Sequence, residues 1–198
     1  MNNQNPKLKF APFAPDVWNA LGALKRTGWV QRGVNKPETV QDHTISLINI
    51  ANSISGSLSP EEKDGLTDIL EVHDWPEAIH GDEVVLSDDE NKLKLLKAIK
   101  FGNEKKAMAS ICEKIGEKGK EIMSLWLRYE TSSDKAAQFA KQLDKYQAVE
   151  LALEYQKTQG IPLFTEFLEH ARKSITHPIL VKRIESLEKE FALITKDK

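Results

Sequence analysis

Helical periodicity runs along almost the whole 198-residue chain and constrains the fold more than any other feature. Apolar residues recur every three or four positions, and no convincing run alternates apolar and polar residues as a half-buried strand does. In segment 39–55, one helical face carries the apolar stripe that we expect to be buried: Val40, Thr44, Leu47, Ile48, Ala51 and Ile54. The sequence therefore predicts an all-α fold of about eight to ten helices.

Local signals predict where several helices begin and end. Asp16 is a good N-cap for a first helix that ends near Gly28. Ser59, followed by Pro60 and Glu62, predicts a capping box that opens a helix over 59–75, which Pro76 then ends or kinks. Further helices are expected in four segments: a lysine-rich one from the "SDDE" capping box at 87–90 to about Phe101, and those over 132–156, 162–175 and 178–194.

Composition indicates one ordinary globular domain over residues 1–198, with residues 1–14 expected to form a flexible N-terminal arm. The net charge of −2 gives no broad basic field, which argues against binding to nucleic acid or to a membrane. No apolar stretch is long enough to span a bilayer, and the N-terminus lacks the apolar region of a secretory signal, so we expect a cytoplasmic protein. The single cysteine, Cys112, excludes an intramolecular disulfide and any CxxC zinc site.

Three polar residues occupy positions that the apolar pattern would give to hydrophobic side chains. They are His43, His73 and Asp144, each in a different predicted helix, and Asp74 follows His73 directly. Any one of them alone would most simply be a hydrogen-bonded core residue. A buried carboxylate is costly unless it is paired, hydrogen-bonded or bound to a metal, and several unrelated exceptions in one core are harder to explain. Together they indicate a metal site.

Two imidazoles and two carboxylates suit one divalent metal, with Mn, Co, Fe, Ni, Zn or Mg as candidates. Four protein ligands on an octahedral ion leave two positions for water or substrate. Such an ion lowers the pKa of bound water from 15.7 to about 7 and so provides hydroxide at neutral pH.

The same residues carry a resemblance to a known family. The order His43, His73-Asp74, Asp144 on a helical chain resembles the HD-domain superfamily of metal-dependent phosphohydrolases. Four blocks resemble its small 5′-deoxyribonucleotidase branch, which includes YfbR-like enzymes and eukaryotic HD-domain-containing relatives: "LKRTGWVQRGVNKPETVQDHT", "VHDWPEAIHGDEV", "LWLRYE" and "FAKQLDKYQAVELALEY". The resemblance runs from about residue 16 to 190.

The resemblance implies a single HD domain, a helical bundle in which His43, His73, Asp74 and Asp144 ligate one divalent metal. It implies a hydrolase that removes the 5′-phosphate from (deoxy)nucleoside monophosphates by attack of metal-bound water. It also implies a homodimer. The partners are then a small nucleotide substrate and a second copy of the chain.

Two acidic residues in the "HDWPEAIHGDEV" block are implied to complete the active site. Glu77 is implied to lie beside the attacking water, and it follows His73-Asp74 by about one helical turn, so it can face the same pocket. Asp82 is implied to lie near the nucleoside sugar. Without the motif, Glu77 would be a solvated charge at a helix end and Asp82 a turn-forming residue after Gly81.

Substrate recognition is predicted in the block "KRTGWVQR". A phosphate monoester needs a cationic partner, for which Arg26 and Arg32 are both candidates, and Trp29 can pack on a sugar or base. The bacterial pattern has an arginine directly before the tryptophan, whereas this chain has Gly28 there. Which arginine binds phosphate therefore stays open.

Other histidines and the lysine-rich run are expected to lie outside the metal site. His80 precedes Gly81 in a turn and is not expected to bind metal, and His170 and His177 are expected on the surface. The run 92–106 is expected to be a solvated face that could border the mouth of the active site.

Other readings stay open at this point. The chain could be another HD enzyme, either a hydrolase of nucleoside triphosphates or alarmones or an iron oxygenase with a second metal. It could also be a non-catalytic HD-fold binding protein. Leu125, Trp126 and Tyr129 exceed what one buried stripe needs, which hints at a homo-oligomer.

Overall fold

The computed structural model describes residues 6–196, and within this range the fold is all-α, as predicted. None of the helices in it has both the length and the apolarity needed to cross a membrane. The elements in chain order are η1 (Ala11–Phe13), α1 (Pro15–Ala23), α2 (Thr27–Gln31), α3 (Val40–Ile54), η2 (Ser55–Ser57), α4 (Pro60–Lys63), α5 (Leu66–Val72), α6 (Glu77–His80), α7 (Glu90–Ile115), α8 (Glu117–Thr131), α9 (Lys135–Gln159), α10 (Phe164–Arg172) and α11 (Pro178–Lys196).

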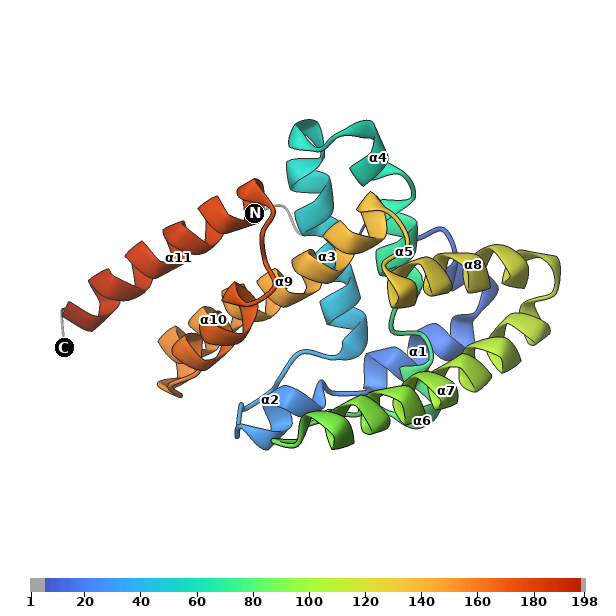
Figure 1. Cartoon of the computed structure of the whole chain (residues 1–198), viewed down its shortest axis with the longest axis horizontal. Coiled ribbons are helices and arrows are strands. Elements are labelled where there is room, and N and C mark those ends of the chain that lie inside the picture. The colour runs from blue at the N-terminus through green and yellow to red at the C-terminus, as the bar shows by residue number, and fades with distance from the viewer. Residues whose placement is uncertain (1–5, 197–198) are drawn as a thin grey trace.

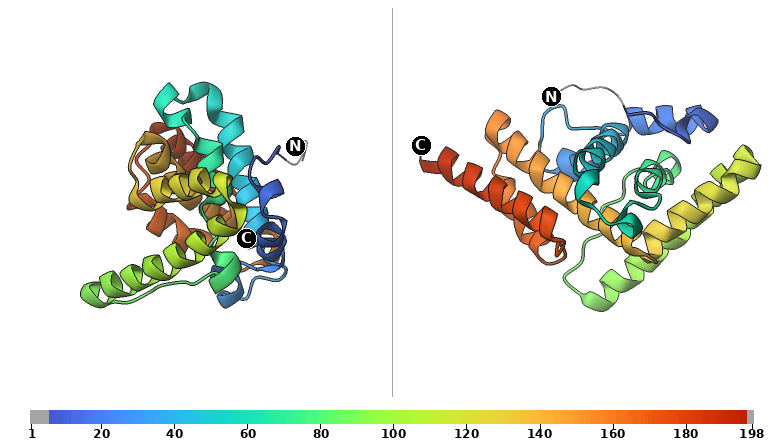
Figure 2. Two further views of the ribbon diagram at one scale, coloured as in Figure 1. Left: turned by 90° about the vertical axis from the view of Figure 1, so that its right-hand side faces the viewer. Right: turned by 90° about the horizontal axis from the view of Figure 1, so that it is seen from above.

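The core lies where α3, α5, α8 and α9 contact one another, and Figure 1 shows α9 crossing in front of α3. Helices α10 and α11 pack on α9, and α11 forms one end of the molecule. Helix α7 packs on α8 and contacts α6. The two long helices α7 and α9 diverge from each other, as the view from above in Figure 2 shows. Residues of both helices line the polar cleft described below.

Helix α3 has the boundaries and the buried face that its sequence predicts. All six residues of the expected stripe are buried, and His43 lies among them with no exposed surface. Thr39 and Asp42 form a reciprocal capping box: the Asp42 N–H donates to the Thr39 hydroxyl, and the Asp42 carboxylate accepts from the Thr39 N–H. This cap fixes the first turn of the helix and therefore the position of His43.

The helix predicted over 59–75 is broken in two at Gly65. The Ser59–Glu62 capping box is present as predicted, but α4 ends at Lys63 and α5 begins at Leu66. Gly65 has a φ of 70°, a left-handed conformation that favours glycine, and a Cβ there would lie 2.9 Å from the Arg128 guanidinium. The break lets α5 turn into the core independently of α4.

Other predicted helix boundaries were wrong. The first helix begins at Pro15, with Ala14 rather than Asp16 at the N-cap, and it ends at Ala23, so that Gly28 lies inside α2. Helix α7 continues through Gly102 to Ile115, because one internal glycine costs only about 1 kcal/mol and the second half of the helix packs on α8. Its N-cap is Asp89, whose carboxylate accepts from two backbone N–H groups of the first turn, rather than the predicted capping box.

The expected N-terminal arm is anchored wherever the structure describes it, and residues 1–5 lie outside the described range. Phe10 is completely buried. The buried carboxylate of Glu71 accepts hydrogen bonds from the backbone N–H groups of Lys9, Phe10 and Ala11 at 2.8, 2.6 and 2.7 Å. Residues 9–14 of the expected arm therefore contact the rest of the domain, and their flexibility stays a prediction.

The apolar residues that hinted at an oligomer belong to the core of the monomer. Leu125, Trp126 and Tyr129 are all buried, with Trp126 stacked on Phe101. Their apolar character is explained by packing within the chain, so they give no evidence for an interface.

Candidate metal centre and active site

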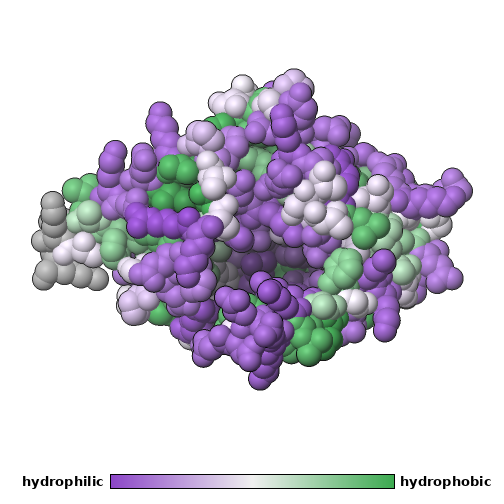
Figure 3. Space-filling view, in the orientation of Figure 1, coloured by the Kyte–Doolittle hydropathy of each residue, from purple (hydrophilic) through white to green (hydrophobic). Residues whose placement is uncertain are grey.

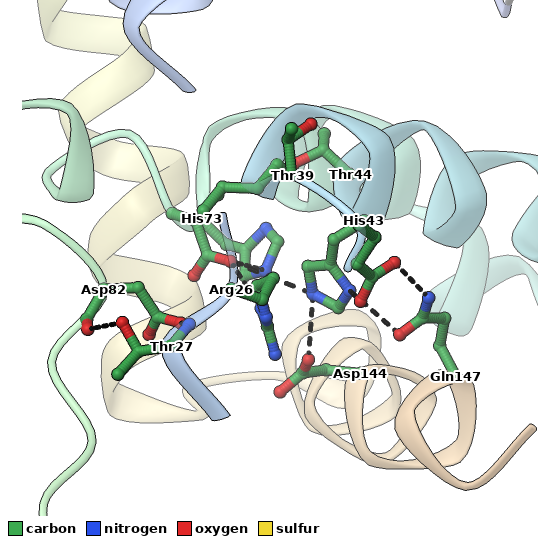
Figure 4. A network of polar contacts seen from close by, with 12 residues as sticks. Arg26, Thr27, Thr39, His43, Thr44, His73, Asp82, Asp144 and Gln147 are labelled. Carbon is green, nitrogen blue, oxygen red and sulfur yellow. Dashed lines mark hydrogen bonds and ion pairs between the residues drawn. The ribbon is translucent and has the colours of Figure 1, made fainter. Parts of the chain in front are cut away.

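The structure brings the four predicted metal ligands together from three helices. His43 lies one turn inside α3, His73 caps α5 and Asp74 follows it, and Asp144 lies in the middle of α9. His43 Nε2 is 3.0 Å from Asp144 Oδ1 and 3.8 Å from Asp74 Oδ2, and His73 Nε2 is 3.0 Å from Asp74 Oδ2. Figure 4 shows His43, His73 and Asp144 directed toward a common point.

The hydrogen bonds behind the two imidazole rings favour the tautomer that a metal requires. His43 Nδ1 lies 3.0 Å from Gln147 Oε1, and His73 Nδ1 lies 2.8 Å from the Leu70 carbonyl oxygen. Both partners are acceptors, so each Nδ1 carries the proton and each Nε2 offers its lone pair. Both Nε2 atoms are buried without a hydrogen-bond partner, although carboxylate oxygens lie nearby. This donor set fits a divalent ion.

Charges around the ligands keep both carboxylates ionised. Burial would raise the pKa of Asp144, but the adjacent His43 ring and the charge of Arg26 lower it to about 2. Burial opposes ionisation of Asp74 as well, yet His73 and Arg26 hold its pKa well below the usual range. Arg26 Nη1 lies 3.3 Å from Asp74 Oδ2. Both side chains are therefore in the state that metal ligation needs.

The four residues lie at or beside a polar cleft of about 420 Å³. Figure 3 shows it as a hollow among hydrophilic residues near the middle of the face in view. Its lining includes Arg26, Glu77, Asp82 and, from α7, α8 and α9, a further set: Lys97, Lys100, Phe101, Glu104, Tyr129, Glu130 and Lys141. The cleft is large enough for a small polar ligand.

Glu77 faces this cleft as predicted, because Pro76 starts a new short helix instead of kinking the preceding one. Helix α5 ends at Val72, and Pro76 is the N-cap of α6, whose first residue is Glu77. Glu77 is 6% exposed and its Oε2 has no hydrogen-bond partner. Burial raises the pKa of Glu77 well above its usual value, and the charges of Asp74 and Asp82 add to the effect. A carboxyl group whose pKa is raised in this way is better suited to accept a proton than an exposed carboxylate is.

Asp82 also lines the cleft, held there by the start of α2. Its Oδ2 accepts from the Thr27 N–H at 2.6 Å, and its backbone carbonyl accepts from the Thr27 hydroxyl at 2.6 Å. Thr27 donates both bonds, and Figure 4 shows Thr27 and Asp82 together beside the metal centre. The pair fixes the loop after α6 against α2.

Two of the three residues predicted to bind substrate do not reach the cleft. Trp29 is 2% exposed, stacks on Phe167 at 4.5 Å and donates its indole N–H to Glu38 Oε1 at 3.0 Å. Arg32 pairs with Glu166 and lies over the same phenylalanine ring. Both side chains belong to a small cluster between α2 and α10, which leaves Arg26 as the predicted residue in the cleft.

The sequence argument named no lysine as a site residue: it gave the run 92–106 as a solvated face that could border the mouth of the active site, and it did not consider Lys141. Lys100 lies 3.4 Å from Glu104, and Lys141 donates to the Glu130 carbonyl at 3.0 Å. Burial would lower the pKa of Lys100, but the charges of Glu104 and Glu77 raise it above the usual value. Helical spacing offers a signal, because Lys141 is three residues before Asp144 on one face of α9.

The remaining histidines lie away from the metal centre. His80 is exposed and contacts the Asn103 carbonyl oxygen at 3.1 Å, and His170 is exposed on α10. His177 was expected on the surface but is partly buried, with Nε2 3.1 Å from Glu62 Oε1 and its ring against Phe139.

Comparison with known proteins identifies relatives over most of the chain. The model of the HD domain family matches residues 19–185. The 5′-deoxynucleotidase HDDC2 of Mus musculus is 34% identical over 175 residues, which cover 86% of this chain and 84% of that protein. The 5′-deoxynucleotidase hdd1 of Schizosaccharomyces pombe is 32% identical over 184 residues, covering 90% and 88%. A predicted metal-dependent phosphohydrolase from Magnetospirillum magnetotacticum shares the fold, with a TM-score of 0.66, 18% identity and coverage of 90% and 89%.

Proposed function

The chain belongs to the HD domain family, and from this premise we propose that it is a metal-dependent hydrolase that removes the 5′-phosphate from deoxynucleoside monophosphates. The observation that carries the proposal is the convergence of His43, His73, Asp74 and Asp144 with both Nε2 atoms free of hydrogen bonds. The names of the relatives, 5′-deoxynucleotidases, support the choice of substrate.

The four ligands would hold a divalent ion, which supplies a Lewis acid and lowers the pKa of water. Glu77 lies in the same cleft with a raised pKa, so it accepts the proton of the attacking water and returns it to the 5′-oxygen as the phosphorus–oxygen bond breaks. Asp82, fixed by Thr27, would contact the sugar.

Three cations of the cleft would offset the charge of the phosphate. Arg26 is half-buried beside Asp74, and Lys100 and Lys141 approach from α7 and α9. Opposed cations in a site with little water stabilise the charge that develops on the transferring phosphoryl group. We assign phosphate binding to these three residues rather than to Arg32 or Trp29.

We further infer a transition metal such as Mn, Co, Fe, Ni or Zn rather than Ca, with Mg as a candidate, because imidazole nitrogens are among the ligands. We also infer a cytoplasmic homodimer. An interface there is supported by three exposed apolar side chains, Leu86 before α7 and Leu95 and Ile99 within its first three turns, which are 70, 62 and 51% exposed. Light scattering coupled to gel filtration measures the mass directly.

A phosphate-release screen over nucleotides and divalent metals tests the proposed function. Deoxynucleoside 5′-monophosphates should be hydrolysed with Mn²⁺ or Co²⁺, and His73→Ala and Asp144→Ala should abolish the activity. His170→Ala is the control, because His170 is exposed on α10 and bonds only within its own helix. Activity of chelator-treated protein would contradict the proposal.

The same screen separates the other HD activities. Preferential hydrolysis of nucleoside triphosphates or alarmones would show that these, and not deoxynucleoside monophosphates, are the substrates. More than one tightly bound iron per chain in elemental analysis would indicate an oxygenase instead.

A further inference from the structure

A buried chain of hydrogen bonds approaches His43 from the side opposite the cleft. The Trp29 indole donates to Glu38 Oε1 at 3.0 Å, Gln147 Nε2 donates to Glu38 Oε2 at 2.9 Å, and Gln147 Oε1 meets His43 Nδ1 at 3.0 Å. Figure 4 shows Gln147 and His43 joined in this way, with Asp144 on the other side of the imidazole ring. The chain thus links α2 and α9 to a metal-facing histidine of α3.

The components of this chain are shielded from solvent. Trp29, His43 and Gln147 are 2, 0 and 3% exposed, and the side chain of Glu38 is 9% exposed. In the described part of the chain, Glu38 forms no ion pair with a lysine or arginine; the His43 ring lies within reach, with Nδ1 3.8 Å from Glu38 Oε1. Burying a carboxylate that is stabilised only by hydrogen bonds costs free energy, which indicates that Glu38 has a role beyond packing.

The direction of every bond follows from the carboxylate. An ionised Glu38 can only accept, and an indole N–H can only donate. Gln147 must therefore turn its NH₂ group toward Glu38, which leaves its carbonyl oxygen toward His43. That oxygen can only accept, so His43 must carry its proton on Nδ1 and keep the Nε2 lone pair for the centre.

We propose that Glu38 and Gln147 are positioning residues that fix the tautomer and orientation of His43 and thereby set the affinity of the centre for its metal. We call Trp29, Glu38 and Gln147 the relay. Within it, Trp29 orients the Glu38 carboxylate. The inference rests on the proposed metal site but not on the proposed substrate. Partners of this kind typically change metal affinity by about 10- to 100-fold.

A purely structural role makes a different prediction, because it changes stability without changing metal binding. The backbone of Glu38 is held independently of its carboxylate, since its N–H donates to the Tyr155 hydroxyl at 2.8 Å. Glu38→Gln is therefore expected to fold even if Gln147→Met does not. Trp29→Phe keeps one aromatic ring beside Phe167 and removes the N–H together with part of the ring volume.

Metal titration of the full chain tests the relay. Protein stripped with a chelator is titrated with Mn²⁺ or Co²⁺ by calorimetry. Gln147→Met should weaken binding by about 10- to 100-fold, Glu38→Gln should weaken it in the same direction, and Trp29→Phe should have the smallest effect. Since Glu38 acts through Gln147, adding Glu38→Gln to Gln147→Met should cause no further loss.

The matched control is Gln156→Met on the same helix. Gln156 Oε1 accepts from the N–H groups of Leu163 and Phe164 and contacts no residue of the centre, so this variant should lose stability but keep the metal affinity. Nitrogen-15 NMR of metal-free protein should show His43 as the Nδ1–H tautomer in the wild type and a mixture in Glu38→Gln.

The outcomes separate the relay from the metal site itself. Wild-type affinity and an unchanged tautomer in Glu38→Gln would overturn the relay, as would losses that add fully in the double variant. If wild-type protein binds neither ion, the proposed metal site fails first.

Discussion

Replacement of Glu77 by glutamine should slow the reaction and stabilise the protein at the same time. The carboxyl group is 6% exposed, its Oε2 has no partner, and the charges of Asp74 and Asp82 oppose its ionisation. Burial and these two carboxylates oppose the Glu77 charge, so at neutral pH the uncharged Glu77→Gln should raise the free energy of unfolding. The gain should be about 1.4 kcal/mol per pKa unit by which folding raises the Glu77 pKa. Loss of the proton acceptor should lower kcat by about 10²- to 10⁴-fold, with a smaller effect on KM.

The gain in stability should depend on pH in a direction set by the raised pKa of Glu77. In chelator-treated protein the folded state retains the Glu77 proton at pH values where the unfolded chain, with its ordinary pKa of 4.5, has lost it. Unfolding free energy of the wild type therefore falls as pH rises from 4.5 through the folded-state pKa. The variant lacks this fall, so the difference should grow with pH. Urea denaturation across the pH series measures it.

The same substitution at Glu71 is the matched control, because there the carboxylate is satisfied. Both Glu71 oxygens accept backbone N–H groups, so an amide nitrogen at one of them faces donors. Glu71→Gln should lose about 1–3 kcal/mol of stability while kcat of the folded enzyme is maintained. Undiminished kcat in Glu77→Gln, or a destabilisation like that of Glu71→Gln, would refute the role assigned to Glu77.

Other predictions concern the framework. Asp134→Ala removes the N-cap of α9 and a partner of Arg128, and should cost about 1–2 kcal/mol in urea denaturation at pH 7. The hydrogen bond from Arg128 lowers the pKa of Asp134 to about 2, so this contribution is present above pH 3.8 and should disappear toward pH 2, where variant and wild type converge. Gly119→Ala places a Cβ 2.1 Å from the Cys112 carbonyl oxygen, and should lower stability by about 1–3 kcal/mol. Gly102→Ala, with open space around the new methyl, should instead raise stability by about 0.4–1 kcal/mol, and a loss there would contradict the packing described.

Periodicity predicted the parts of the fold that depend on local pattern. The stripe of α3 is buried as expected, and the polar residues that interrupt apolar rows, His43, His73 and Asp144, meet in one place. Their positions in the sequence do not give the distances between them in space. Their meeting point is determined by the contacts among α3, α5 and α9, which the structure shows. Metal binding by these residues stays a prediction.

Side-chain direction in short helices could not be predicted in this way. Helix α2 has five residues, too few for a periodic signal, and the aromatic cluster with Phe167 turns Trp29 and Arg32 away from the cleft. The lysines of α7 and α9 show the opposite case. From the sequence, Lys100 is expected to be one more solvated charge. In the structure, the direction of α7 places it beside the carboxylates of the cleft.

The two imidazoles differ in what holds them, and this difference has an evolutionary consequence. His73 bonds to the Leu70 backbone carbonyl, which any residue at that position would provide, so sequence drift leaves this support intact. His43 depends on the side chain of Gln147, which a single nucleotide change can remove. The support of His73 is therefore robust to mutation, whereas the support of His43 has to be maintained by selection.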